Sequence, residues 1–125
     1  MIDFSNSPVV KLSQVKIDSI EKTIAPLLIE GENVISAYKS VRDFVCFTNK
    51  RVISVNVQGF TGKKKDFTSM PYAKISVFAV ETAGTFDLDS ELEMYFSGVG
   101  KVKFEFTGNS DIVEISRLIA GFCLK

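Results

Sequence analysis

Histidine is absent from the 125 residues of this chain, and so is tryptophan. Without histidine, the many serines and threonines lack the base that activates the nucleophile of a Ser-His-Asp arrangement. No histidine or cysteine spacing of a metal site is present, and the eight glycines fit neither a P-loop nor a dinucleotide-binding fingerprint. We therefore expect no catalytic residues, no cofactor and no metal, and a binding or assembly module. A hydrolase with a carboxylate pair stays open as a third hypothesis.

An excess of charge of either sign is also absent, because fifteen Lys and Arg balance fifteen Asp and Glu. A nucleic-acid binder usually carries a basic excess, so this balance argues against a nucleic-acid partner. A net charge of zero also makes self-association easier. The first residues lack the basic start of a signal peptide, and no segment approaches the roughly 18 apolar residues of a membrane-spanning helix. We therefore expect a cytoplasmic protein, in which two cysteines make no disulfide scaffold.

The pattern along the chain predicts one mainly β domain. Residues 1–11 are predicted to be a flexible leader, and residues 13–30 a helical segment, because isoleucines recur at helical spacing before Pro26. Residues 34–107 are predicted to form seven strands, of which the last two alternate apolar and charged residues. Residues 111–124 are predicted to form a second helix, since Asp111 and Glu114 have the spacing of a capping box. This helix would plug one end of a barrel.

The densest basic cluster consists of Lys63, Lys64 and Lys65, directly after a turn with two glycines. Lys50 and Arg51 lie on another predicted turn and join the cluster as candidate contacts for phosphate or an anionic lipid. The alternative is an ordinary solvated strand end, where Asp66 neutralises part of the charge. Because a zero net charge weakens long-range attraction to an anionic membrane, we do not expect a strong lipid site here.

Two segments carry more apolar surface than one barrel needs. The fifth strand, predicted over residues 74–82, has apolar residues on both faces, and Phe78 and Val80 occupy the face that a half-exposed strand would keep polar. The N-terminal helix adds a stripe of Ile17, Ile20 and Ile24. A contiguous exposed patch is a liability on a monomer, so these five residues are predicted to lie at an interface between identical subunits.

Several runs of residues resemble the bacterial pleckstrin-homology (PH) domain family, in order and with matching spacing, over about residues 27–122. The runs are Leu27-Leu28-Ile29-Glu30-Gly31-Glu32, Ala37-Tyr38-Lys39, Arg42-Asp43, Phe47-Thr48-Asn49-Lys50-Arg51, Gln58-Gly59-Phe60-Thr61-Gly62-Lys63-Lys64, Ser69-Met70-Pro71-Tyr72 and residues 81–92. The resemblance implies a PH-like partly open barrel of seven antiparallel strands in two roughly orthogonal sheets, capped by a C-terminal α-helix. It also implies homo-oligomeric rings, with pentamers as the expected form, and it implies no enzymatic activity.

These observations together predict a non-enzymatic PH-like module that forms a homo-oligomeric ring and binds an unknown protein partner or a small ligand. The rival hypothesis is a peripheral module that binds anionic lipid or phosphate through Lys63–Lys65. Lipid binding by eukaryotic relatives depends on basic residues around a long loop between their first two strands. That connection is short in this chain, with only Lys39 and Arg42 nearby.

Overall fold

The computed structural model describes residue 1, residues 3–4 and residues 8–124. Its main feature is one eight-stranded sheet that curls into a half-barrel, with strand order β5-β4-β3-β2-β1-β8-β7-β6. The strands are β1 (Val9–Val15), β2 (Val34–Ser40), β3 (Asp43–Thr48), β4 (Arg51–Gln58), β5 (Lys64–Pro71), β6 (Ile75–Glu81), β7 (Ser90–Phe96) and β8 (Gly100–Phe106). The helical elements are η1 (Ile17–Ser19), α1 (Glu21–Ile24), η2 (Ala25–Leu27), η3 (Tyr72–Lys74) and α2 (Ile112–Cys123). The prediction of a mainly β, partly open barrel with a C-terminal helix is thus confirmed.

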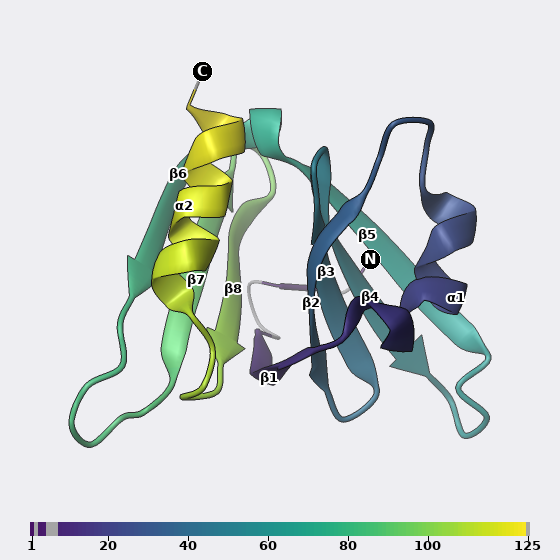
Figure 1. Ribbon diagram of the computed structural model, residues 1–125, viewed down its shortest axis with the longest axis horizontal. Helices are drawn as coiled ribbons and strands as arrows, with labels where there is room; N and C mark the ends of the chain where they lie inside the picture. Colours follow the sequence, from purple (N-terminus) through teal and green to yellow (C-terminus); the bar gives the residue numbers. More distant parts are fainter. Residues whose placement is uncertain (2, 5–7, 125) are drawn as a thin grey trace.

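Strand β1 joins the two halves of this sheet, which lie on opposite sides of the molecule (Figure 1). Its second half pairs antiparallel with β2, where Ser13 lies opposite Lys39, and its first half pairs parallel with β8, where Val9 lies opposite Phe104. Three predictions were therefore wrong for residues 9–15. These residues form an eighth strand, which was not predicted, and part of that strand pairs in parallel. Residues 9–11 belong to this strand and not to a flexible leader. Residues 2 and 5–7 of that leader lie outside the described residues.

The N-terminal helical segment predicted over residues 13–30 is shorter and divided. Residues 13–15 belong to β1, and three short helical turns follow between Ile17 and Leu27. Pro26 lies in the first turn of η2, where a missing N–H removes no helical hydrogen bond. Ile20 and Ile24 are buried against the outer face of β2, β3 and β4, in a second core with Ala37, Phe44, Cys46, Ile53 and Val55. Ile20 and Ile24 therefore form an apolar stripe, as predicted, and this stripe packs against the sheet of the same subunit.

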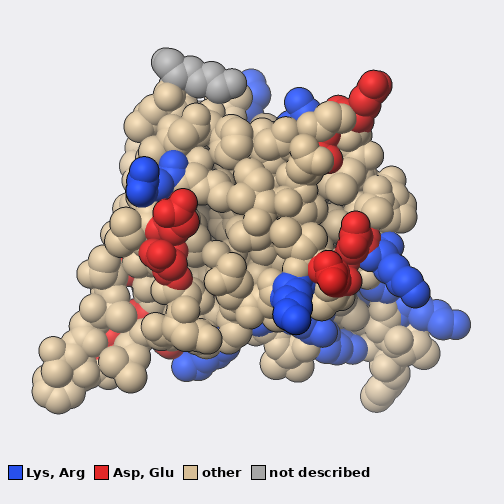
Figure 2. All heavy atoms as spheres, in the orientation of Figure 1, with Lys and Arg blue, Asp and Glu red and all other residues tan. Residues whose placement is uncertain are grey.

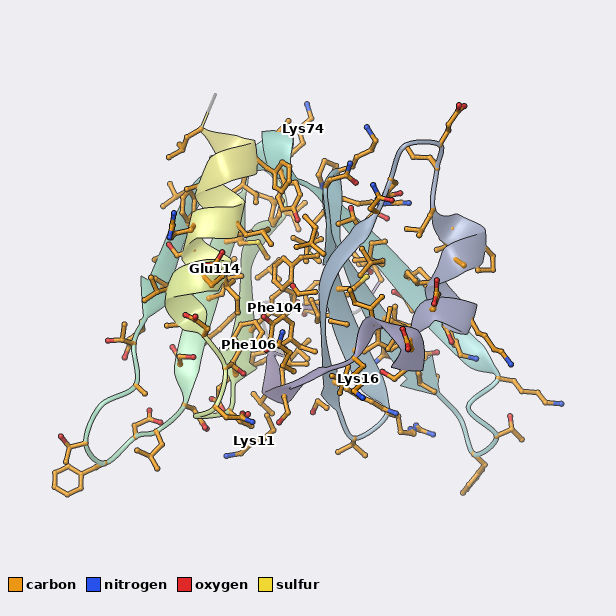
Figure 3. The ribbon with its side chains drawn as sticks, viewed as in Figure 1. Lys11, Lys16, Lys74, Phe104, Phe106 and Glu114 are labelled. Atoms are coloured by element: carbon orange, nitrogen blue, oxygen red, sulfur yellow. The ribbon has the colours of Figure 1, made fainter. Side chains whose placement is uncertain are left out.

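Helix α2 closes the main core on the side of β6, β7 and η3. The carboxylate of Asp111 accepts a hydrogen bond from the N–H of Glu114 at 3.1 Å, which caps the first turn as predicted. Figure 3 shows Phe104 and Phe106 pointing from β8 into the space between the two halves of the sheet, and Glu114 on the outer side of the helix. Among the described residues, no helix has the length and apolar character needed to cross a bilayer.

The outer face of β7 and β8 carries the charged residues predicted for it. Lys103 lies 3.2 Å from Glu91, and Lys101 lies 3.8 Å from Glu93. Because the strand register sets Lys103 opposite Glu93, both ion pairs run diagonally across the hairpin. The alternation also buries Leu92, Met94, Phe96, Val102, Phe104 and Phe106 on the inner face.

Candidate functional site

The predicted basic cluster divides between two distant places. Lys50 and Arg51 lie at the β3–β4 turn, whereas Lys63–Lys65 lie at the β4–β5 turn. In the β4–β5 register Arg51 lies opposite Pro71, and Gln58 lies opposite Lys64. Strand β4 has eight residues, so its seven steps separate the two turns by roughly 23 Å. The five residues therefore do not form one anion site.

Arg51 is committed to a contact within the subunit. Its guanidinium group binds the carboxylate of Glu32 and donates from Nη2 to the carbonyl oxygen of Leu27 at 2.8 Å. The hydrogen bond from Arg51, together with the hydroxyl of Thr48 and the N–H of Ile29, lowers the pKa of Glu32 to about 2. This network fastens the segment after η2 to the β3–β4 hairpin. The assignment of Arg51 as an anion contact is corrected to a structural role.

Lys63, Lys64 and Lys65 are exposed at the start of β5. Asp66 does not neutralise them through an ion pair, because its carboxylate binds the terminal ammonium of Met1 at 2.6 Å and accepts from the hydroxyl of Thr68 at 2.9 Å. The hydrogen bond from the ammonium of Met1 also lowers the pKa of Asp66. In Figure 2, Lys and Arg atoms border the lower and right-hand edges of the molecule, and the centre of that face carries no charged side chain.

The apolar residues predicted for the subunit interface are mostly used inside the subunit. Phe78 and Val80 are half-buried and pack against the main core beneath α2, while Ile20 and Ile24 belong to the second core and Ile17 is half-buried. The phase of β6 is therefore the reverse of the predicted one: Val77 and Ala79 point outward, and the side chain of Val77 is 63% exposed. The reason is that α2 lies along β6, so it covers the face that holds Phe78.

The outward face of β6 and β7 contains a shallow apolar hollow of about 360 Å³, lined by Val77, Ala79, Glu93, Met94, Tyr95 and Lys101. Val77 and Tyr95 are its large exposed apolar side chains. A second hollow of about 150 Å³ lies at the end of β6, where Glu81, Glu91 and Glu93 line it. The outward surface beside β6 is therefore apolar around Val77 and is lined by glutamates at the end of β6, near Glu81.

The two outermost strands of the sheet differ in charge. Among the described residues, strand β5 pairs only with β4 and strand β6 pairs only with β7, so each has one edge without a strand partner there. The β5 edge starts with Lys64 and Lys65, and the β6 edge ends with Glu81, which is exposed. No sequence pattern indicated which strands would be outermost, because the order of the sheet depends on the position of β1.

The described residues include no group of three or more His, Cys, Asp or Glu side chains that could hold a metal ion. Both cysteines are free thiols. Burial raises the pKa of Cys46 to about 12, so this group stays protonated and is a poor nucleophile near neutral pH.

A curled, mainly antiparallel half-barrel closed by a C-terminal helix is the architecture of a PH-like domain. The sequence profile of the family described as bacterial PH domain matches residues 3–123, and the chain belongs to this family. The family and fold expected from the resemblance are thereby confirmed.

Two relatives in Bacillus subtilis are similar over most of their length. The uncharacterised protein YjqA is 46% identical over 108 residues, which cover 85% of this chain and 86% of YjqA. The uncharacterised protein YozO is 37% identical over 98 residues, which cover 78% of this chain and 84% of YozO.

Two solved structures from Shewanella share the fold. A DUF1696 family protein with a PH domain from Shewanella loihica is 40% identical, with a TM-score of 0.80, and the match covers 92% of this chain and 99% of that protein. A PH domain from Shewanella amazonensis is 41% identical, with a TM-score of 0.69, and the match covers 90% and 92% of the two chains.

Proposed function

We propose that this chain is a non-enzymatic cytoplasmic module that assembles head-to-tail into a homo-oligomeric ring and presents its surface to a protein partner or a small ligand. The observation that carries this proposal is the pair of unlike sheet edges, basic on β5 and acidic on β6. Such edges carry unpaired backbone N–H and C=O groups that can extend the sheet into a neighbouring subunit.

Charge selects which edges join. In an antiparallel pair of like edges, the lysines of β5 would lie beside Pro71 and Glu81 would lie beside Ile75, so like edges form no ion pair. In an antiparallel pairing of β5 with β6 of the next subunit, the start of one strand lies beside the end of the other. Lys64 and Lys65 then face Glu81. The contact is head-to-tail, and a head-to-tail contact that closes makes a ring.

Two further features support assembly. The apolar hollow around Val77 and Tyr95 flanks the β6 edge, so a neighbour that pairs there also covers exposed apolar surface. The zero net charge of the chain leaves little overall repulsion between subunits. The ring size of five follows from the resemblance to the PH-domain family.

Light scattering on the purified chain at micromolar concentration tests the ring. The proposal expects a mass near five times 13.8 kDa. Glu81→Lys and the pair Lys64→Glu with Lys65→Glu should each shift the mass toward the monomer. The three changes together should restore the ring, because the charges are exchanged rather than removed. Glu21→Lys, an exposed reversal on α1, is the matched control and should leave the mass unchanged. A monomeric wild-type chain contradicts the proposal.

One observation favours the rival function, binding of an anionic lipid surface. Phe60 is fully exposed at the tip of the β4–β5 loop, just before Lys63–Lys65. Nη1 of Arg42 donates to the carbonyl oxygen of Gly59 at 2.6 Å, which holds this loop beside the β2–β3 turn. An apolar tip beside basic side chains suits a membrane interface.

Sedimentation with vesicles separates the two functions. The rival function expects salt-sensitive binding to anionic vesicles, weak binding to zwitterionic ones, and loss of binding on Phe60→Ala or on Lys63→Ala with Lys64→Ala and Lys65→Ala. Val41→Ala, a change at the exposed tip of the neighbouring turn, controls for a general effect of apolar loops. Absence of binding by the wild-type chain rules the rival out.

A further inference from the structure

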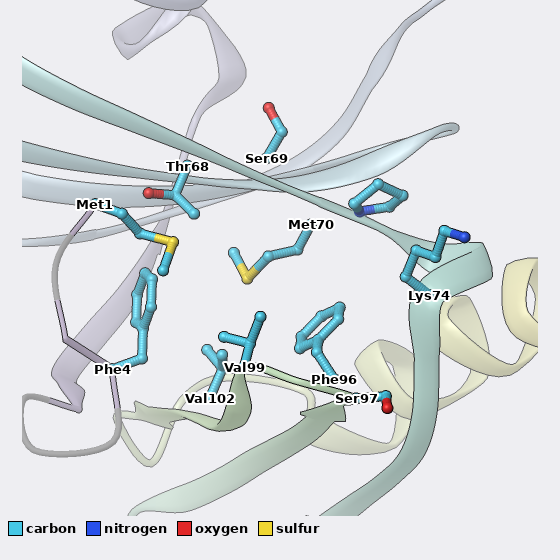
Figure 4. A pocket seen from close by; sticks show the side chains of 11 residues that line it. Met1, Phe4, Thr68, Ser69, Met70, Lys74, Phe96, Ser97, Val99 and Val102 are labelled. Atoms are coloured by element: carbon cyan, nitrogen blue, oxygen red, sulfur yellow. The ribbon is translucent and has the colours of Figure 1, made fainter.

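A cleft of about 440 Å³ opens between strand β5 and the turn that joins β7 to β8. Figure 4 shows β5 above it, the β7–β8 turn below it, and Met1 and Phe4 at one end. Its floor consists of Met70, Phe96 and Val102, which belong to the main core and are almost fully buried. The volume lies within the range of about 300–1,000 Å³ that is typical of small-molecule sites.

The cleft exists because the barrel is open on this side. Strands β5 and β6 are the two ends of the sheet and do not pair with each other, so no strand of the described part of the chain closes the gap between them. Met1 and Phe4 line part of the opening. The ring of Phe4 lies edge-on to that of Phe104, with centroids 6.3 Å apart, and so fixes one wall of the cleft.

The polar groups of the cleft carry positive charge. Lys74 is the only charged side chain among the residues that line it, and no ion-pair partner of Lys74 is found among the described residues. Figure 4 places Lys74 at the end opposite Met1, above the ring of Phe96. Thr68, Ser69 and Ser97 also line the cleft, but the hydroxyl of Thr68 donates to Asp66 and the hydroxyl of Ser69 accepts from Nη1 of Arg51. The terminal ammonium of Met1 is already bound by Asp66.

We propose that this cleft binds a single-chain amphiphile with an anionic head group, such as a medium-chain fatty acid. The apolar tail lies against Met70, Phe96 and Val102, and the head group is held by the ammonium of Lys74 at the rim. The thioethers of Met1 and Met70 both point into the cleft in Figure 4, and methionine side chains adapt their shape to a flexible chain. An anion is favoured over a cation because none of the described residues that line the cleft has an acidic side chain.

This inference rests on the ligand-binding part of the proposed function and is independent of the ring. Calorimetric titration of the full chain with dodecanoate, below its micelle concentration, tests it directly. We expect saturable binding of one dodecanoate per chain, weaker binding of dodecanol, and no binding of dodecyltrimethylammonium. Lack of saturable dodecanoate binding, or equal binding of the cationic amphiphile, overturns the proposal.

Two pairs of variants locate the site. Val99→Trp fills the cleft and should abolish binding. The control is Val113→Trp on α2, which should not affect binding. The two valines are equally exposed, at 56% for Val99 and 57% for Val113. Lys74→Ala should weaken dodecanoate binding by about fivefold and leave dodecanol binding unchanged, whereas Lys22→Ala on α1 should change neither. Binding that survives Val99→Trp in a folded chain places the ligand elsewhere and overturns the proposal.

Light scattering on the same samples separates this inference from the ring. Glu81→Lys should lose the ring and keep dodecanoate binding, because Glu81 is not among the residues that line the cleft. Val99→Trp should lose dodecanoate binding and keep the ring. Circular dichroism of each variant confirms folding before titration, and the comparison of the three amphiphiles needs no variant at all.

Discussion

The guanidinium group of Arg51 donates two hydrogen bonds to the carboxylate of Glu32, from Nε at 2.9 Å and from Nη2 at 2.8 Å. The side chain of Glu32 has no exposed surface, and the hydroxyl of Thr48 donates at 2.7 Å to Oε2, the oxygen that also accepts from Nε of Arg51. Glu32 belongs to the loop after η2, and Arg51 begins β4. The ion pair therefore fixes the N-terminal helical turns to the sheet and helps to keep Ile20 and Ile24 in the second core.

Replacing Arg51 with alanine should lower the free energy of unfolding by about 3–5 kcal/mol, because a buried carboxylate is left without its counter-charge. Lys50→Ala, at the neighbouring exposed position, should change it by no more than about 0.5 kcal/mol. Urea denaturation of both variants measures the difference. Equal stability of the two variants would show that the ion pair has no structural role.

The same pair predicts a loss of stability in acid. The pKa of Glu32 is about 2 in the folded chain and 4.5 when unperturbed. The contribution of Glu32 to the free energy of unfolding is therefore complete above pH 4.5. It disappears as the pH falls from 4.5 to 2, because the carboxylate takes up a proton more readily in the unfolded chain than in the folded one. The difference corresponds to roughly 3 kcal/mol. Urea denaturation across this range should show a shallower pH slope for Glu32→Gln than for the wild type, and Glu21→Gln should keep the wild-type slope.

The parts of the fold that were predicted from the sequence depend on local patterns. Strands β7 and β8 alternate apolar and charged residues without interruption, and the α2 cap needs only Asp111 and the N–H of Glu114. Strand β1 lacks such a pattern. Lys11 adopts a φ of 61°, and the pairing with β8 shifts between Val9 and Leu12, so the alternation breaks in the middle of the strand. Its parallel partner is also distant in sequence.

The candidate sites were harder to predict, because they depend on which elements meet. Alternation shows that Phe78 and Val77 lie on opposite faces of β6, but only the position of α2 decides which face is inside. The basic residues of the two turns looked like one cluster, and the length of the β4–β5 hairpin separates them. The Glu32–Arg51 pair left no sequence signal beyond two opposite charges 19 positions apart.

Helix α2 should be required for stability, and its residues should contribute according to their burial. Ile119 is fully buried and Leu118 is half-buried, whereas Val113 is exposed. Ile119→Ala should cost about 2–5 kcal/mol, Leu118→Ala should cost less, and Val113→Ala should cost little. Thermal unfolding midpoints rank the three variants. Midpoints that do not differ would mean that α2 does not close the core.

The two faces of β6 can be tested with the same substitution at neighbouring positions. Phe78→Asp places a carboxylate against the main core beneath α2, where its desolvation is unfavourable, so the variant should unfold at markedly lower temperature or fail to fold. Val77→Asp places the same carboxylate on the outward face, so the unfolding midpoint should remain near that of the wild type. If the outward face belongs to the subunit contact, Val77→Asp should lower the assembled mass while the chain stays folded.

Circular dichroism and light scattering on both variants distinguish a loss of folding from a loss of assembly. A folded, stable Phe78→Asp variant would contradict the observed phase of β6, because a charge is tolerated only on the face that meets water.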